Sequence, residues 1–356
     1  MLGFDGRAAR YTWTVALTAV ALLLLYEVRK TLFVFILALL LAYLLFPLVN
    51  LLNRVLPTNR ARPVALALAY IIFIGLMVLM AINLGERVIA EAQNFAQSFP
   101  KMLSDWESTR AGSPALNSLK DQIIDRARTV FAANSGDVLS TIERAGVKAL
   151  SVASDVVFVI VIPILSFFFL KDGQLLRQHI LDLVDKGPQR ALLDDVMEDV
   201  HLLLAHYMRA LVLLSLAAFT AYSIAFEIMG ISYAVLLAAL GGMLEFIPML
   251  GPLVAGVIIT IVTLVSRAPV LVVLIFLLAY RVFQDYILSP QLMRQGVALH
   301  PLLVLFGVFA GAELAGIPGT FLSVPVLALA RLIYVRIRKA KVTARLAPEI
   351  PEEQLR

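Results

Sequence analysis

The clearest candidates for chemistry are polar side chains inside otherwise apolar sequence in the last third of the chain. Glu245 stands in the apolar segment GGMLEFIPMLGP. A charge at the centre of a membrane span costs roughly 2.5–3.5 kcal/mol, so its presence suggests use. A carboxylate beside freed backbone carbonyls could bind a cation, carry a proton or hydrogen-bond a polar solute, whereas at the membrane interface it would merely be hydrated. The residues that interrupt the helix around it are Gly241, Gly242, Pro248, Gly251 and Pro252.

A second polar cluster stands in the segment RVFQDYILSP. In a helix, Arg281 and Asp285 lie four residues apart on one face and could form an ion pair that removes most of the insertion penalty. A purely structural pair is one interpretation. The other places Gln284 or Asp285, with Arg281 beside them, in the path of a solute.

Two further titratable residues stand next to positions that break helices. Because imidazole titrates near neutral pH, His300 could relay protons, although a histidine before a proline is more often a turn or capping residue. Glu313 lies one turn before another break, where it could line the solute path or, in a tight helical hairpin, lie near the surface. The breaking residues of these segments are Pro290, Pro301, Gly316, Pro318, Gly319 and Pro325.

The elements that must position these residues are membrane-spanning helices. Hydrophobic residues make up 61% of the 356 positions and charged residues 15%, against roughly 45–50% and about 25% in an average soluble domain. The excess forms runs of about 16 to 23 residues, and a helix needs about 20 to cross a bilayer. The sequence therefore predicts an all-α integral membrane protein whose main partner is membrane lipid.

We expect about eight transmembrane helices, with broken or re-entrant helical hairpins in the C-terminal half. Six spans plus two hairpins, or ten spans, satisfy the charge pattern equally well. The expected regions are an N-terminal three-span region at 1–84, an extracytoplasmic amphipathic insert at 85–148, a fourth span at 149–172, a cytoplasmic helical hairpin at 173–206, a transport core at 207–340 and a cytoplasmic tail at 341–356.

Both polar inserts carry apolar residues at helical spacing. The 85–148 insert has eight basic and eight acidic residues, enough to keep it out of the bilayer core. Its apolar residues recur every three or four positions, which predicts amphipathic helices that lie on the membrane or against a neighbouring protomer. The 173–206 insert shows two such stripes separated by a turn at 186–188, which predicts a helical hairpin.

Basic residues set the expected orientation, because cytoplasmic loops are enriched in lysine and arginine. Arg54, Arg60 and Arg62 follow the second apolar run, and the tail from Arg331 to Arg345 carries six basic residues. Both termini are therefore expected in the cytoplasm. The first apolar run has no small-residue cleavage pattern after it, so we interpret it as an uncleaved span.

Several functional classes are disfavoured. The chain has no cysteine, which excludes disulfides and thiolate metal sites. His201 and His206 fall on different faces of a helix, so no metal site is expected. The motifs G-x-S-x-G, G-x-G-x-x-G and H-E-x-x-H and the P-loop are missing, so we expect no enzyme, no cofactor and no direct use of ATP. Much of the net charge of +5 stands beside apolar runs, where topology and anionic lipid explain it better than nucleic acid.

Five motifs follow one another along the chain, namely PILSFFFLKD at 163–172, GGMLEFIPMLGP at 241–252, RVFQDYILSP at 281–290, LHP at 299–301 and GIPGTFLSVP at 316–325. This ordered set resembles the autoinducer-2 exporter (AI-2E) transporter family, also called PerM-like permeases. The resemblance covers about residues 10–340 and implies a bacterial inner-membrane permease with about eight spans. It assigns Glu245, Pro248, Gly251 and Pro252 to the family's interrupted helix, and Pro290, His300 and Pro301 to its LHP region.

The resemblance also implies what such a permease carries and how it assembles. Some members are assigned export of the furanone autoinducer-2, and others are similar to sodium or lithium to proton antiporters. Members can form homo-oligomers, including pentamers. Three functions stay open: a secondary transporter of small polar solutes such as autoinducer-2, a Na+(Li+)/H+ antiporter using Glu245 and Asp285, and a non-transporting membrane scaffold.

Overall fold

The structure is a computed structural model of the chain. It describes residues 6–56, 61–108, 114–115, 117–118, 120–129, 131–132, 160–266, 268–292 and 299–346. The first half of the expected fourth span, the end of the 85–148 insert and the segment 293–298 lie outside the described residues. The described chain divides into two compact units, one formed by the residues up to Leu66 together with 160–173, and one formed by the rest.

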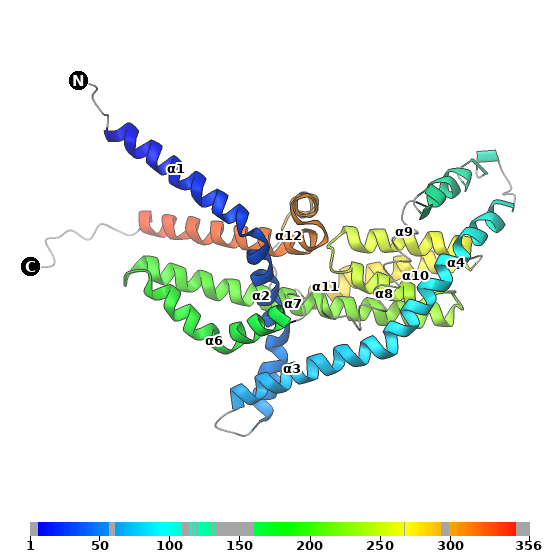
Figure 1. The fold of residues 1–356 in the computed structure, drawn as a ribbon, viewed down its shortest axis with the longest axis horizontal. Coiled ribbons are helices and arrows are strands. Elements are labelled where there is room, and N and C mark those ends of the chain that lie inside the picture. The colour runs from blue at the N-terminus through cyan, green and yellow to red at the C-terminus, as the bar shows by residue number, and fades with distance from the viewer. Residues whose placement is uncertain are drawn as a thin grey trace, which may run out of the picture. The chain divides into compact units, whose positions relative to one another are not determined.

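The first unit consists of helices from two distant parts of the sequence (Figure 1). It contains α1 (Gly6–Glu27), α2 (Arg29–Val55) and the first part of both α3 (Ala61–Met80) and α6 (Ile162–Asp182). Phe35 on α2 packs edge-to-face on Phe169 of α6, with ring centroids 6.1 Å apart. The Arg62 guanidinium donates a hydrogen bond to the Leu170 carbonyl at 3.2 Å. These contacts hold α6 against the N-terminal helices within this unit.

The second unit carries the interrupted helices that the sequence predicts. Its helices are α4 (Glu86–Ser108), α7 (Pro188–Ile228), α8 (Ala234–Leu244), α9 (Leu250–Val265), α10 (Val270–Phe283), α11 (Ser289–Leu292) and α12 (Pro301–Leu346), together with the later parts of α3 and α6. Two π-helical turns join neighbouring helices, Ala81–Gly85 before α4 and Gln284–Leu288 before α11. Helix α8 packs along the long helix α7, and α9 packs on α8 and on α10 (Figure 1).

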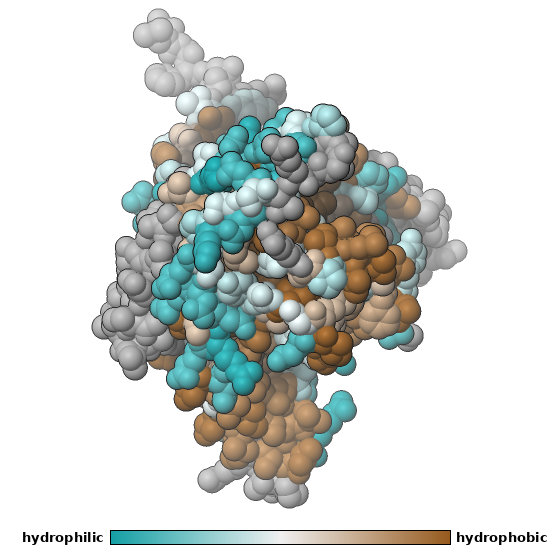
Figure 2. Space-filling model, turned by 90° about the vertical axis from the view of Figure 1, so that its right-hand side faces the viewer, coloured by the Kyte–Doolittle hydropathy of each residue, from teal (hydrophilic) through white to brown (hydrophobic). Residues whose placement is uncertain are grey.

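The described residues form helices and no strands, which confirms the predicted all-helical class. Five helical stretches are long and apolar enough to cross a membrane; these are Arg29–Val55, Arg62–Ser108, Pro188–Ile228, Val270–Leu292 and Pro301–Lys339. Figure 2 shows broad exposed hydrophobic areas beside a band of hydrophilic residues, as expected for a surface that lipid covers. The protein is therefore a multi-pass membrane protein, while the count of eight crossings stays a prediction.

Helix α7 is long enough to continue beyond the lipid. With 41 residues it extends about 60 Å, roughly twice the hydrocarbon thickness of a bilayer. Its first turns follow α6 after a short turn that ends at Gly187, and Pro188 occupies the first helical position, where a missing N–H costs nothing. Polar residues fill these first turns, so this end of α7 belongs to the predicted helical hairpin.

Aromatic side chains tie α7 to α10. Tyr222 of α7 packs on Tyr280 of α10 with ring centroids 5.1 Å apart, and Phe226 packs on Phe276 at 6.0 Å. Such pairs contribute about 0.5–1.5 kcal/mol each beyond the area that they bury. Because Tyr280 is one turn before the π-helical turn at Gln284, this packing also fixes the position of that turn.

Helix α12 is a helical hairpin. Its backbone leaves helical geometry at Ala315 and at Gly316, where φ is +64° and ψ is −146°, a conformation that only glycine adopts readily. The arms on either side approach so closely that a Cβ on Gly311 would overlap the backbone of Gly319, and the reverse. The predicted tight hairpin at GIPG is therefore present, and its re-entrant insertion in the membrane stays a prediction.

The amphipathic helix α4 rests on helices of its own chain. Phe95 packs edge-to-face on Tyr233 at 5.3 Å, and Phe99 and Leu103 are buried in a cluster with Val265 of α9. The Glu91 carboxylate accepts a hydrogen bond from the Leu236 N–H at 2.8 Å, which satisfies a donor in the first turn of α8. At these residues α4 packs on α8 and α9 of its own chain. These helices supply the apolar surface that we expected from lipid or from a neighbouring protomer.

Candidate functional site

The predicted helix interruption around Glu245 is present, and it separates α8 from α9. Helix α8 ends at Leu244 and α9 begins at Leu250. Between them Met249 has φ of +65°, an uncommon conformation for a residue with a side chain. Gly251 is buried so tightly against the turn that a Cβ would overlap the Leu244 carbonyl oxygen. The sequence around Glu245 therefore forms a compact break inside the helical unit.

Glu245 is buried in this break and is hydrogen-bonded across the fold. Its side chain is 6% exposed, and its Oε2 accepts a hydrogen bond from Nε2 of Gln284 at 2.7 Å. Gln284 is 3% exposed and opens the π-helical turn that follows α10. Turns of this kind occur often at functional sites, because the extra residue per turn redirects a side chain. Here the turn brings the amide to a carboxylate 39 positions away in sequence.

Arg281 and Asp285 form the ion pair that their spacing predicts. The Nε of Arg281 lies 2.8 Å from Oδ2 of Asp285, and both side chains are partly exposed, at 40% and 44%. Partial exposure makes such a pair worth little for stability, typically about 1 kcal/mol or less. Arg281 and Asp285 act on the buried Glu245 with opposite signs, so the charge of each is largely offset by the other.

These polar groups face a cavity of about 350 Å³. A pocket of this size suits a small organic molecule. Polar and charged side chains occupy part of its lining, and apolar side chains form the remainder. The lining residues are Leu203, His206, Tyr207, Leu211, Leu214, Glu245, Pro248, Met249, Pro252, Arg281, Gln284, Asp285, Ser289, Leu299, Pro301, Val304, Val324 and Ala328.

The structure therefore brings together most of the residues that the sequence predicts for a solute path. Among the predicted positions, the cavity is lined by Glu245, Pro248, Pro252, Arg281, Gln284, Asp285 and Pro301. The buried Gly251 does not line it and instead allows the break to close. Gly241 and Gly242 are buried too, where α8 packs closely on α7. The carbonyl oxygen of Gly242, close to the break, accepts a hydrogen bond from the Ser215 hydroxyl at 2.7 Å.

Other predicted positions do not line this cavity. His300 is exposed, and its Nδ1 accepts a hydrogen bond from the Leu302 N–H at 3.3 Å, the geometry of a residue that caps the start of α12. Glu313 is exposed one turn before the bend. Pro290 is exposed on α11. The remaining predicted breaks, Gly316, Pro318, Gly319 and Pro325, belong to the α12 hairpin.

Sequence reasoning missed the wall that α7 contributes. Leu203, Tyr207, Leu211 and Leu214 recur at steps of four and three along this helix and line one side of the cavity. His206 lines it as well, with Nδ1 2.7 Å from the Leu202 carbonyl oxygen. A carbonyl oxygen only accepts hydrogen bonds, so Nδ1 carries the proton that it donates in this bond. The stripe was visible in the sequence, but nothing local showed which helices it faces.

The family of this chain follows from comparison with known proteins. The model of the family described as AI-2E family transporter matches residues 15–339. The chain belongs to this family. The AI-2E chain is also similar to YrrI of Bacillus subtilis (strain 168), which is provisionally named a transport protein. The two are 25% identical over 337 residues, which cover 88% of this chain and 89% of YrrI.

Two further relatives carry similar provisional names. YueF of Bacillus subtilis (strain 168), named a transport protein, is 24% identical over 353 residues, which cover 91% of this chain and 92% of YueF. PerM of Escherichia coli (strain K12), named a permease, is 25% identical over 306 residues, which cover 83% of this chain and 84% of PerM. The family is one of transporters and permeases, which implies transport rather than enzyme chemistry.

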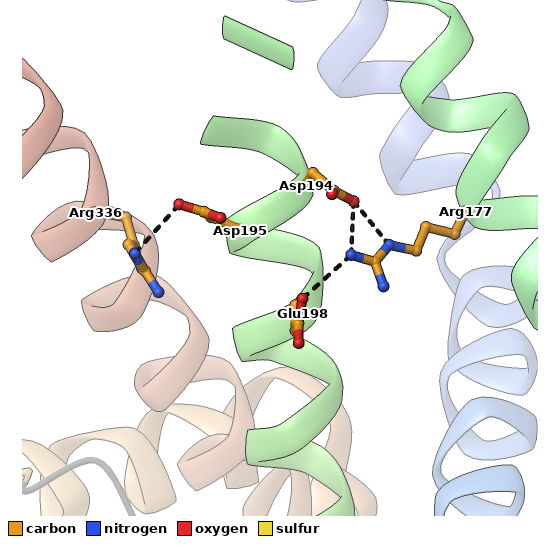
Figure 3. Close-up of polar contacts among 5 residues, drawn as sticks. All are labelled: Arg177, Asp194, Asp195, Glu198 and Arg336. Carbon is orange, nitrogen blue, oxygen red and sulfur yellow. Dashed lines mark hydrogen bonds and ion pairs between the residues drawn. The ribbon is translucent and has the colours of Figure 1, made fainter. Parts of the chain in front are cut away.

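Ion pairs at the polar end of α7 join this helix of the AI-2E transporter to two other helices (Figure 3). Arg177 on α6 pairs with Asp194 at 2.6 Å and with Glu198 at 3.4 Å, and the hydrogen bond to Asp194 raises the pKa of its guanidinium above the ordinary value. Arg336 on α12 pairs with Asp199 at 2.5 Å and with Asp195 at 3.5 Å. Carboxylates on two faces of α7 thus join it to α6 and to α12.

Proposed function

We propose that this AI-2E protein is a secondary transporter in a bacterial inner membrane, with both termini in the cytoplasm, that passes small polar molecules without using ATP itself. Autoinducer-2 is the named solute of this proposal, and export is its direction. The single observation that carries the proposal is the cavity beside the buried Glu245–Gln284 pair, which is lined by residues of interrupted helices and of α7. Broken helices around a midplane site are a common way to build a transport path.

The chemistry of the cavity supports passage of a polar solute. Its polar groups are concentrated at Glu245, Gln284, Arg281 and Asp285, while much of the remaining lining is apolar. Hydroxyl groups of a small furanone would find hydrogen-bond acceptors there, and its ring would contact apolar side chains. We also propose that the protein works as a homo-oligomer, for which a pentamer is the expected form from the family resemblance.

A plug variant tests the proposal. Ala328 is 6% exposed and lines the cavity, so Ala328→Trp fills part of the cavity with an indole. Ala330, exposed on the same helix, gives the matched control Ala330→Trp. In proteoliposomes loaded with autoinducer-2, we expect wild type and Ala330→Trp to release the solute and Ala328→Trp to retain it. Equal release by both variants would show that this cavity is not the path.

A second candidate function is Na+(Li+)/H+ antiport, which the burial of Glu245 favours because a carboxylate in a cavity can exchange a proton for a cation. This function predicts a sodium-dependent proton flux in the same proteoliposomes that Glu245→Gln abolishes. Release of autoinducer-2 that needs no ion gradient favours export instead. Stable protein partners together with no flux of any tested solute would favour the scaffold interpretation.

A further inference from the structure

Side chains at the polar end of the cavity carry buried polar atoms that lack a hydrogen-bond partner. The hydrogen bond between Gln284 and Glu245 uses the amide Nε2 and the carboxylate Oε2. Glu245 Oε1 and Gln284 Oε1 are buried and receive no hydrogen bond from the described part of the chain, and the same holds for the hydroxyl of Tyr207 on α7. All three side chains line the cavity. Buried polar atoms in proteins are nearly always paired, so this cluster points to a ligand that brings its own donors.

The charge of the cavity lining also selects the ligand. Arg281 pairs with Asp285 at 2.8 Å, so these two charges offset each other. Glu245 is the remaining acidic side chain of the lining, and its carboxylate, when ionised, adds a negative charge that this pair does not balance. A buried charge is costly unless a partner of opposite sign lies close to it. The ligand that balances this cavity carries a single positive charge.

The cavity walls favour an organic cation over a metal ion. Ca2+ takes about six to eight oxygen ligands, and Mg2+ takes six in octahedral geometry, whereas the described residues contain no group of three side chains arranged to hold a metal. Leu203, Leu211, Leu214, Val304 and Val324 line the same cavity, and apolar surface of this kind gains nothing from a bare ion. An apolar body attached to the charged group would fill that space and release water from it.

We propose that the cavity binds a small protonated amine with an apolar body, whose ammonium group donates to Glu245 and Gln284. An ammonium group has three N–H donors and no acceptor, which matches the carboxylate oxygen, the amide oxygen and the hydroxyl of Tyr207. The inference rests on the proposed function and adds a substrate class to it, because neutral polar solutes use the acceptors but leave the negative charge unbalanced.

Three ligands that share a phenyl body and differ in their polar head group test this inference. The probes are 2-phenylethylamine, 2-phenylethanol and 3-phenylpropionate, each measured by equilibrium binding to the full chain in nanodiscs at neutral pH. Because hydrogen bonds to charged groups are the strong ones, we expect the amine to bind about tenfold or more tightly than the alcohol, and the carboxylate to bind worst. Equal affinity for amine and alcohol in the wild-type protein would overturn the inference.

Variants separate the site from general effects of charge. Glu245→Gln keeps the shape of the side chain and removes its charge, so we expect amine binding to weaken about tenfold or more and alcohol binding to change little. Glu313→Gln removes an exposed carboxylate outside the cavity and should leave both unchanged. Unchanged amine binding in Glu245→Gln, or binding that Glu313→Gln weakens equally, would contradict the assignment.

Ligand binding and solute passage are measured in separate experiments, so the two proposals can fail independently. Release of autoinducer-2 by a wild-type protein that shows no preference for the amine overturns this inference and leaves the proposed function standing. Amine binding that depends on Glu245, in a protein that passes none of the tested solutes, overturns the proposed function and leaves the binding site standing. Displacement of the amine by sodium at equal concentration would assign the site to an inorganic cation and overturn the inference.

Discussion

The hydrogen bond between Gln284 and Glu245 gives a prediction about stability that depends on both residues being buried. Replacing Gln284 by leucine removes the donor and leaves a carboxylate that is 6% exposed without it. Hydrogen bonds to charged groups contribute about 1.5–3 kcal/mol, so we expect Gln284→Leu to lower the free energy of unfolding by that amount. The apolar surface added by leucine offsets little of this loss, because an unpaired carboxyl group stays buried.

The double variant Glu245→Leu/Gln284→Leu isolates the pair. Removing both partners replaces the pair by apolar groups of similar size, which is often nearly neutral, so we expect the double variant to recover most of the stability that Gln284→Leu loses. The measurement is denaturant unfolding of the detergent-solubilised chain followed by circular dichroism. Gln291→Leu, at an exposed glutamine nearby, is the control and should change stability by about 0.5 kcal/mol or less. A double variant as unstable as the sum of the two single variants would refute the buried pair.

Three further variants test the elements that shape the site. Gly251→Ala should disrupt folding or abolish passage, because its Cβ overlaps the Leu244 carbonyl oxygen, whereas Gly256→Ala on the same helix has open space and should behave as wild type in size-exclusion and flux assays. Gly316→Ala has open space too but places a side chain at φ of +64°, so we expect a loss of about 1–3 kcal/mol in unfolding experiments. Glu91→Gln keeps an acceptor oxygen but removes the negative charge at the start of α8, so we expect a loss of about 0.3–1 kcal/mol, and hydrogen exchange should quicken in the first turn of α8 while α10 stays unchanged.

Local sequence rules predicted the elements whose cause is local. Glycine and proline around Glu245 indicated a helix break, and the structure ends α8 at Leu244 and begins α9 at Leu250. The spacing of Arg281 and Asp285 predicted their ion pair. The GIPG segment predicted a tight hairpin, and the chain bends there at Gly316. In each case the residues that decide the geometry are neighbours in sequence.

Long-range contacts decided the features that the sequence did not reveal. The partner of Glu245 is Gln284, and nothing in either segment marks the other, because a π-helical turn orients the amide. The apolar face of α4 suited lipid as well as protein, and only the presence of α8 and α9 decides that Phe99 is buried within the chain. His300 had both a proton-relay and a capping interpretation, and its hydrogen bond to the Leu302 N–H is that of a cap.

Solute passage requires a cavity beside Glu245 that solutes reach from water, and the absence of native cysteine makes this access directly measurable. Ser289 lines the cavity, and Ser166 is fully buried, at 0% exposed, so Ser289→Cys and Ser166→Cys are matched single-cysteine variants. We expect a charged, membrane-impermeant thiol reagent to label Ser289→Cys in proteoliposomes, with protection by a bound solute, and to leave Ser166→Cys unlabelled. Equal resistance of both variants to the reagent applied from either side would contradict the solute-accessible cavity.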